Sequence, residues 1–129
     1  MNCFVVANNV TETIGSFYSN HFSAEAATPI AKTFLDAYKT RWGNDSDALA
    51  ALGYDATKIL LNAMITADKA GKLDSQGIRD AIAATKGDFV TGNISFDADR
   101  NTVKSAVILE ITKGADGKLA TKYKTTVNP

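Results

Sequence analysis

The chain has 129 residues, of which 45% are hydrophobic, and this length supports one core rather than two. Lysine plus arginine and aspartate plus glutamate each number 14, so the formal net charge is zero. No long-range field therefore attracts nucleic acid or an anionic membrane. Cys3 is the only cysteine, which excludes an internal disulfide framework. We expect a single domain over residues 1–129 that does not bind nucleic acid.

The N-terminal segment 1–13, MNCFVVANNVTET, joins a short apolar run to turn-prone polar residues, which indicates a short edge strand or a loosely held arm. Only two residues precede Cys3, so we expect no signal peptide in this chain. Asp, Lys or Asn interrupts every apolar window, so we also expect no membrane insertion. From Ile14 to Phe22, alternating aromatic and small residues predict a strand.

A first helix is predicted between Thr28 and Gly43. Thr28 can cap it, Pro29 suits the first helical position, and Gly43 suits the left-handed residue that ends it. Large apolar residues recur at every fourth position, which is the spacing that burial of a helix face requires. We therefore expect this stripe to be core rather than a stacking platform: Ile30, Phe34, Tyr38 and Trp42.

A second helix is predicted from a cap at Asp45 or Ser46 to Gly71. Its polar residues fall on one narrow stripe, and Asp55 on that stripe is expected to be solvated. A helix that is apolar over most of its circumference must be covered on more than one side. Gly53 in its interior costs about 1 kcal/mol relative to alanine, which suggests the close approach of another backbone.

A third helix, from about Ser75 to Thr85, carries Ile78 and Ile82 on its inner face and ends near Gly87. The period then changes to two, which predicts three strands over residues 90–96, 102–112 and 118–127. Turn residues separate these strands, so a hairpin or meander is expected. The predicted order is strand, helix, helix, helix, strand, strand, strand, which is an α/β fold.

Catalytic or metal chemistry needs several converging polar groups, and the chain offers one histidine and one cysteine. Nothing places His21 beside Cys3 or supplies a third orienting group, so no catalytic residue is predicted. DADRN, residues 97–101, opens like a calcium loop, but Thr102 and Ile108 replace the turn glycine and the bidentate glutamate. A hairpin turn explains it better. No nucleotide-binding glycine motif is present, and we predict neither metal nor cofactor.

Several stretches taken together resemble the C-terminal part of the leucine/isoleucine/valine-type amino-acid-binding proteins of ABC transporters. These are FYSNHFSAEAATPIAKTFLDAYKTRWG, DALAALGYDATKILLNAM, IRDAIAATKGDFVTGNISFDADRNTVKSAVILEI and the closing KTTVNP. They occur in the family's order over 14–129. The resemblance implies part of a lobe of the type I periplasmic-binding-protein fold, an ABC permease as partner, a periplasmic or extracellular location, and no enzymatic step.

The resemblance also suggests where an amino acid would bind. Tyr54 in LGYDA matches an aromatic residue that lines the ligand side-chain pocket in that family. Asn20, His21 and Phe22 end the first predicted strand, and ligands of open α/β sheets lie beyond the carboxyl ends of strands. A core role for Tyr54 and a structural hydrogen-bonding role for His21 remain alternatives.

Segment 1–13 departs from the family, whose chain is much longer there. The resemblance therefore implies a C-terminal third of a receptor, in which ligand binding is retained or lost. The second helix would leave apolar surface uncovered, so we expect self-association into a homo-oligomer. The alternative function is a self-associating structural or interaction module that keeps the fold without binding a ligand.

Overall fold

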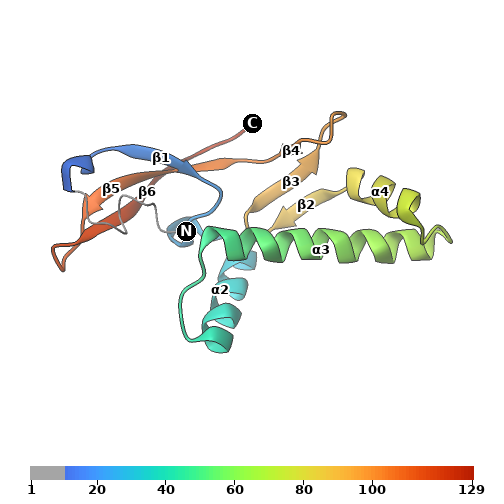
Figure 1. Cartoon of the computed structure of the whole chain (residues 1–129), viewed down its shortest axis with the longest axis horizontal. Helices are drawn as coiled ribbons and strands as arrows, with labels where there is room; N and C mark the ends of the chain where they lie inside the picture. Colours follow the sequence, from blue (N-terminus) through green and yellow to red (C-terminus); the bar gives the residue numbers. More distant parts are fainter. Residues whose placement is uncertain (1–10) are drawn as a thin grey trace.

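The computed structural model describes residues 11–129. Within them, three α-helices lie beside two antiparallel sheets of three strands each (Figure 1). The helices are α2 (Pro29–Trp42), α3 (Ala48–Lys69) and α4 (Ser75–Ala83). The strands are β1 (Phe17–Asn20), β2 (Lys86–Phe89), β3 (Gly92–Phe96), β4 (Thr102–Val103), β5 (Ala106–Lys113) and β6 (Leu119–Val127). Two short 3-10 turns, η1 (Thr11–Thr13) and η2 (Ala24–Ala26), flank β1.

One sheet has the order β1-β5-β6, so the first strand pairs with a strand that lies far along the chain. β5 is its central strand, and Val107, Leu109 and Ile111 are buried on one face, as the alternating pattern predicts. The hairpin of β5 and β6 was expected, and its register places Lys113 opposite Leu119. The four lysines near its end, at 113, 118, 122 and 124, are exposed.

The other sheet has the order β2-β3-β4 and lies above α3 in Figure 1. β2 was not predicted, and the third helix was expected to reach Gly87, whereas α4 ends at Ala83. The expected strand over 102–112 is two strands, β4 and β5, which belong to different sheets. The DADRN segment is the predicted hairpin turn, because Asp97 Oδ1 accepts the N–H groups of Asp99 and Asn101.

The predicted caps explain where α2 begins and ends. Thr28 Oγ1 accepts the N–H of Ala31, and Gly43 has φ 74°. The cap of α3 is Asp47, one residue beyond the two candidates, and its side chain accepts the N–H of Ala50. Asp74 caps α4 in the same way.

The core lies where η2, α2, α3 and the end of β2 meet. Small residues on α3 allow this close packing, since Ala48 and Ala51 are buried against Phe34 and Val90. α4 packs along the C-terminal part of α3. The remaining circumference of α3 is exposed, in agreement with the expectation that this chain leaves apolar surface of the helix uncovered. A Cβ at Gly53 would have no neighbour within 4 Å among residues 11–129, so the expected close approach of another backbone is not found in the described part of the chain.

Candidate functional site

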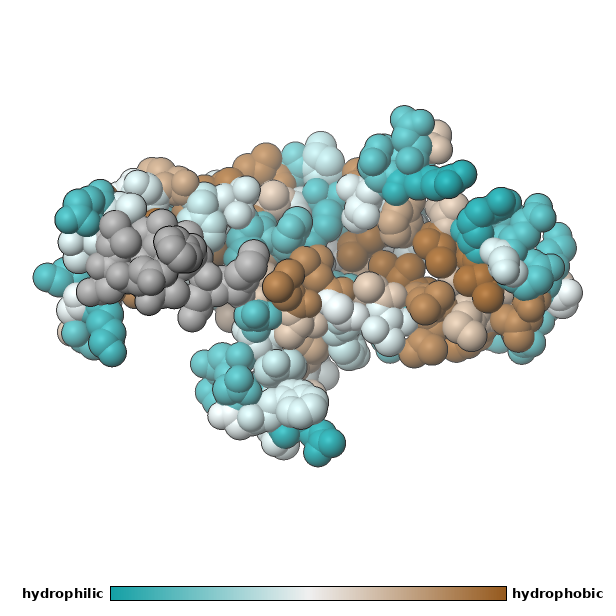
Figure 2. All heavy atoms as spheres, viewed as in Figure 1, coloured by the Kyte–Doolittle hydropathy of each residue, from teal (hydrophilic) through white to brown (hydrophobic). Residues whose placement is uncertain are grey.

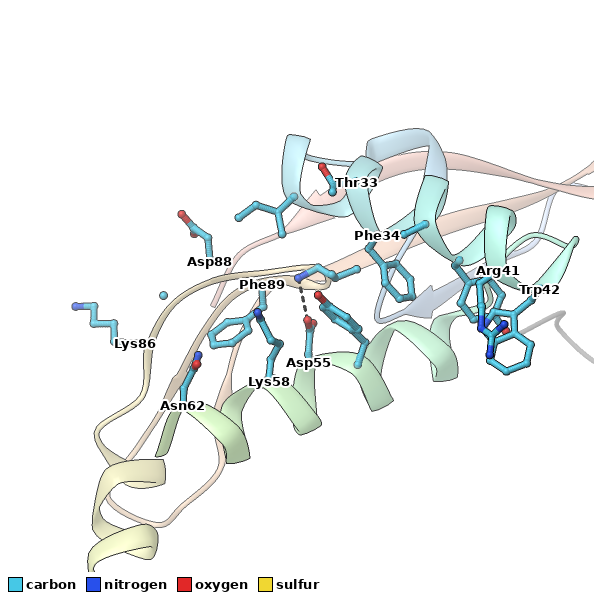
Figure 3. A pocket seen from close by; sticks show the side chains of 16 residues that line it. Thr33, Phe34, Arg41, Trp42, Asp55, Lys58, Asn62, Lys86, Asp88 and Phe89 are labelled. Carbon is cyan, nitrogen blue, oxygen red and sulfur yellow. Dashed lines mark hydrogen bonds between the residues drawn. The ribbon is translucent and has the colours of Figure 1, made fainter. Parts of the chain in front are cut away.

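A hollow of about 710 Å³ lies between α2, α3 and β2 (Figure 3). Pockets of about 300–1,000 Å³ are typical of small-molecule sites. One end of the hollow is aromatic, with the Arg41 guanidinium carbon 5.3 Å from the centroid of the Trp42 ring, and the other end is polar. Its lining includes Phe34, Tyr38, Arg41, Trp42, Tyr54, Asp55, Lys58, Asn62, Lys86, Asp88 and Phe89.

The aromatic end consists of three residues of α2 that recur at every fourth position and of one residue of α3. Phe34 lies with its ring centroid 4.9 Å from that of Tyr54 and 5.7 Å from that of Tyr38. Tyr38 in turn lies 6.4 Å from Trp42. These separations are those of favourable tilted aromatic pairs. The four rings form a continuous apolar wall.

This wall is less buried than the spacing predicted. Of the stripe on α2, Phe34 is buried and Tyr38 is half-buried, whereas Ile30 and Trp42 are exposed. The expectation of a core stripe therefore fails at both ends of the helix, because no further layer of residues 11–129 packs there. Tyr54 is 44% exposed, which places it at the wall of the hollow and not in the core.

Charged and amide side chains of both α3 and β2 line the other end of the hollow. Lys58 and Asn62 come from α3, and Lys86 and Asp88 come from β2. Figure 3 shows Lys58 and Asn62 beside Phe89, while Lys86 and Asp88 point outward from the strand. The Lys58 ammonium can bind the carboxylate of an amino acid and the Asn62 amide oxygen can accept from its ammonium group, while the aromatic wall contacts an apolar side chain.

Asp55 lies between the two ends of the hollow. The sequence predicted that it is solvated, and this prediction is wrong, because only 2% of the residue is exposed. The N–H groups of Val90 and Thr91 donate to its Oδ1 and Oδ2 at 2.9 and 2.8 Å (the dashed line in Figure 3 marks a bond of this carboxylate). These bonds satisfy two backbone donors in the turn between β2 and β3. The carboxylate therefore ties α3 to the sheet that lines the hollow.

Lys104 extends this buried polar group on the far side of the turn. Its Nζ donates to Thr91 Oγ1 at 2.8 Å and to the carbonyl oxygen of His21 at 3.3 Å. Burial lowers the pKa of the Lys104 ammonium below its usual value, and the nearby Asp55 carboxylate opposes that shift. Lys104 thus links β1, through His21, to the turn that Asp55 holds.

The four residues proposed from the sequence do not share one hollow. Tyr54 lines the hollow described above, His21 lines a second one of about 460 Å³, and Asn20 and Phe22 line a third of about 180 Å³. Phe22 is buried in the core, and His21 is exposed. β1 is antiparallel to β5, so the rule for the carboxyl ends of parallel strands does not apply to it.

Among residues 11–129, no group of three or more His, Cys, Asp or Glu side chains could hold a metal ion. Cys3, the expected N-terminal arm up to Val10 and the expected absence of a signal peptide lie outside the described residues.

Residues 7–117 match the family model described as periplasmic binding protein. The chain belongs to the periplasmic binding protein family. The partial lobe of that fold, proposed from the sequence, is confirmed by solved structures that superpose on most of this chain.

Three of these structures illustrate the range of the periplasmic binding proteins. The leucine-binding protein LivK from Thermotoga maritima is 31% identical, with a TM-score of 0.75 over 91% of this chain and 32% of its own. LivJ from Streptococcus pneumoniae, in complex with isoleucine, is 33% identical, with a TM-score of 0.67 over 84% and 30%. A solute-binding protein from Rhodopseudomonas palustris, in complex with 3,4-dihydroxybenzoic acid, is 26% identical, with a TM-score of 0.73 over 90% and 31%.

The chain therefore spans about a third of the length of the relatives it matches. These relatives are substrate-binding proteins, in agreement with the prediction of a protein that is not an enzyme.

One functional residue was misread from the sequence, although a signal for it existed. Asp55 is four residues from both Ala51 and Ile59, which are buried on the inner stripe of α3. An acid at that spacing lies on the core side of a helix and must find hydrogen-bond donors there.

The expectation that no segment is long and apolar enough to span a membrane is also wrong. By length and composition alone, α3 is long and apolar enough to cross a membrane. The core helix of a soluble protein meets the same criterion.

Proposed function

We propose that this chain is a segment of the solute-binding protein of an ABC transporter for amino acids of the branched-chain type. The observation that carries the proposal is the hollow between α2, α3 and β2, which has an aromatic wall at one end and the polar side chains of Lys58 and Asn62 at the other. An apolar amino acid has the same division, with an aliphatic side chain and a zwitterionic end. The similarity to LivK and LivJ supports this choice of ligand.

In this proposal Tyr54 contacts the ligand side chain, and the step is binding without chemical change. Asn20, His21 and Phe22 are proposed as further ligand contacts, reached only in the assembled receptor, because they lie outside the hollow in this chain. An ABC permease is the proposed partner, and a periplasmic or extracellular location follows from the family. A single domain over residues 1–129, without cofactor, completes the proposal.

The fluorescence of Trp42 tests the proposed ligand class directly. Trp42 is the only tryptophan and lines the hollow. Leucine, isoleucine and valine should each change its emission saturably, whereas 3,4-dihydroxybenzoate, the ligand of the Rhodopseudomonas palustris relative, should not. Saturation by the aromatic acid alone would reassign the site to aromatic acids, and no response to any of the four would reject it.

A self-associating module is the second candidate function. The observation that favours it is the group of exposed aliphatic residues on α3, which a second copy could cover. Light scattering at micromolar concentration tests it, since a homo-oligomer has at least twice the mass of 13.7 kDa.

A further inference from the structure

One wall of the hollow is formed by residues 86–90, which comprise β2 and Val90. We call these residues the β2 wall. β2 is the edge strand of its sheet, and among the described strands it pairs only with β3, over four residue pairs. A short edge strand with Gly87 in its interior has little rigidity of its own. The position of the β2 wall therefore depends on what holds the turn at its end.

Asp55 holds this turn from the side of α3. Its carboxylate accepts the N–H groups of Val90 and Thr91, and Figure 3 shows it beneath the end of the β2 wall. Val90 and Thr91 are both buried, so the loss of either bond would leave a buried donor without an acceptor. These bonds fix the backbone of the turn, whereas the Thr91 hydroxyl contacts a different group.

That group is Lys104, which belongs to the connection between the two sheets. Lys104 and Ser105 are the two residues between β4 and β5, and these strands lie in different sheets. The half-buried Lys104 ammonium donates to Thr91 Oγ1 at 2.8 Å and to the carbonyl oxygen of His21 at 3.3 Å. The turn is thus supported from two sides, by a carboxylate of α3 and by an ammonium group of the connection.

The connection also packs directly against the turn. Gly92, the residue after Thr91, has φ 116°, and a Cβ there would lie 3.3 Å from Ser105 Oγ. There is no room for a larger side chain between the turn and the connection at this point. The two segments are therefore packed together at the position next to the Lys104 contacts.

The charges of Lys104 and Asp55 complement one another. Both residues line the second hollow, and Asp55 is the only acid among the described residues that do so. Most of the remaining lining is apolar, and Figure 2 shows hydrophobic side chains gathered along α3. Burial lowers the pKa of the Lys104 ammonium, and the Asp55 carboxylate opposes that shift. In apolar surroundings this ammonium balances the charge of the carboxylate that holds the turn.

We propose that Lys104 is a positioning residue for the ligand, which holds the β2–β3 turn, and with it the β2 wall, in the geometry that binds an amino acid. Lys104 does not line the ligand hollow, so it acts through Thr91 and Asp55. The inference rests on the proposed function for the identity of the ligand. The support of the turn itself can be measured with no ligand present.

Amide hydrogen exchange, followed by NMR without ligand, tests the support of the turn. Lys104→Met removes the charge and both hydrogen bonds and keeps an unbranched side chain. The amides of Val90 and Thr91 should lose at least about tenfold in protection relative to the amide of Ile111. Ile111 is the reference because its N–H donates to Ser16 in the other sheet. An equal loss at all three amides, or no loss at any, would overturn the proposal.

The second arm measures the effect on binding, by calorimetric titration with leucine. Lys104→Met should weaken binding at least about tenfold, and Lys104→Arg, which keeps the charge and the donors, should recover most of that loss. Lys124→Met is the matched control, since it removes an exposed lysine whose Nζ lies 3.3 Å from Glu110 Oε2, and it should not change the affinity. Circular dichroism checks that each variant is folded. Wild-type affinity in Lys104→Met, or an equal loss in Lys124→Met, would contradict the proposal.

A double-mutant cycle tests the route through the Thr91 hydroxyl. Thr91→Val removes this acceptor and keeps the N–H that donates to Asp55. Lys104→Met combined with Thr91→Val should therefore expose the Val90 amide no more than Lys104→Met alone, and additive effects would contradict the route. If the wild type binds no leucine, the proposed function fails, and the exchange measurement alone decides whether Lys104 holds the turn.

Discussion

Asp55 is a carboxylate placed among small apolar residues, and both of its oxygens accept backbone N–H groups in the β2–β3 turn. Such an acid is stable in the interior only because each oxygen has a donor. Its position couples a helix residue to backbone that lies 35 and 36 residues further along the chain. The shape of the proposed site therefore depends on this one side chain.

Asp55→Asn should lower the free energy of unfolding by about 2–4 kcal/mol. The amide has one oxygen where two N–H groups need acceptors, and its own NH₂ faces a donor. Urea denaturation followed by circular dichroism measures the change. Asp36→Asn, on the exposed side of α2, is the control and should change the stability by less than about 0.5 kcal/mol. Equal effects of the two substitutions would show that the Asp55 bonds contribute little.

Lys104 predicts a distinct pH dependence of stability. Burial lowers its pKa in the folded chain below the usual lysine value of 10.5. Between the folded pKa and 10.5 the unfolded chain holds more protons on this group, so the Lys104 contribution to stability rises with pH across that window. The difference in unfolding free energy between wild type and Lys104→Met should therefore increase as pH approaches 10.5. A difference that falls or stays level over that range would contradict the burial of the ammonium group.

For single residues, the sequence predicted which kinds of contact the candidate site residues make better than it predicted where they lie in the fold. Tyr54 was placed by family resemblance and lies at the hollow, whereas Asn20 and His21 were placed by a rule for parallel strands that antiparallel β1 does not obey. Asp55 was assigned to solvent because its helix also carries a true polar stripe, and one-dimensional spacing did not separate the two at that position. Lys104 came together with Thr91 and His21 only through the tertiary fold.

At the scale of elements, substitution by alanine of two glycines inside helices is expected to change stability in opposite directions. A Cβ on Gly77 in α4 would overlap the carbonyl oxygen of Lys72, whereas one on Gly53 in α3 would meet open space. Gly77→Ala should therefore destabilise the chain by about 1–3 kcal/mol. Gly53→Ala should stabilise the isolated chain by up to about 1 kcal/mol. Thermal unfolding of both variants in parallel provides the measurement.

The elements with strong local signals were predictable. α2 has a cap, an N-terminal proline, a four-residue apolar spacing and a terminal glycine, and each of these is present in the structure. β2 and β4 were missed because strands of four and two residues carry little periodic signal, and β2 contains Lys86, Gly87 and Asp88. Their existence depends on pairing with β3, which is a tertiary effect.

For the whole molecule, α3 is incompletely covered: its aliphatic side is exposed. The chain also matches only about a third of each relative. The sequence indicated that α3 needs covering on more than one side, and the chain covers only one. Such incomplete burial is typical of a segment whose packing partners lie elsewhere. The order of the helices and of the longer strands was predictable from caps and periodicity, whereas the tertiary covering of α3 was not.

The proposed function requires that this segment of a periplasmic binding protein binds an apolar amino acid, with Tyr54 in contact with its side chain. Calorimetric titration of the purified chain with leucine tests this requirement, with Tyr54→Ala titrated in parallel with the control Tyr123→Ala, a half-buried tyrosine on β6 that does not line the hollow. We predict saturable binding with one leucine per chain, weakened at least about tenfold by Tyr54→Ala and unchanged by Tyr123→Ala. The absence of heat from a folded wild-type chain, or equal binding by all three proteins, would contradict it.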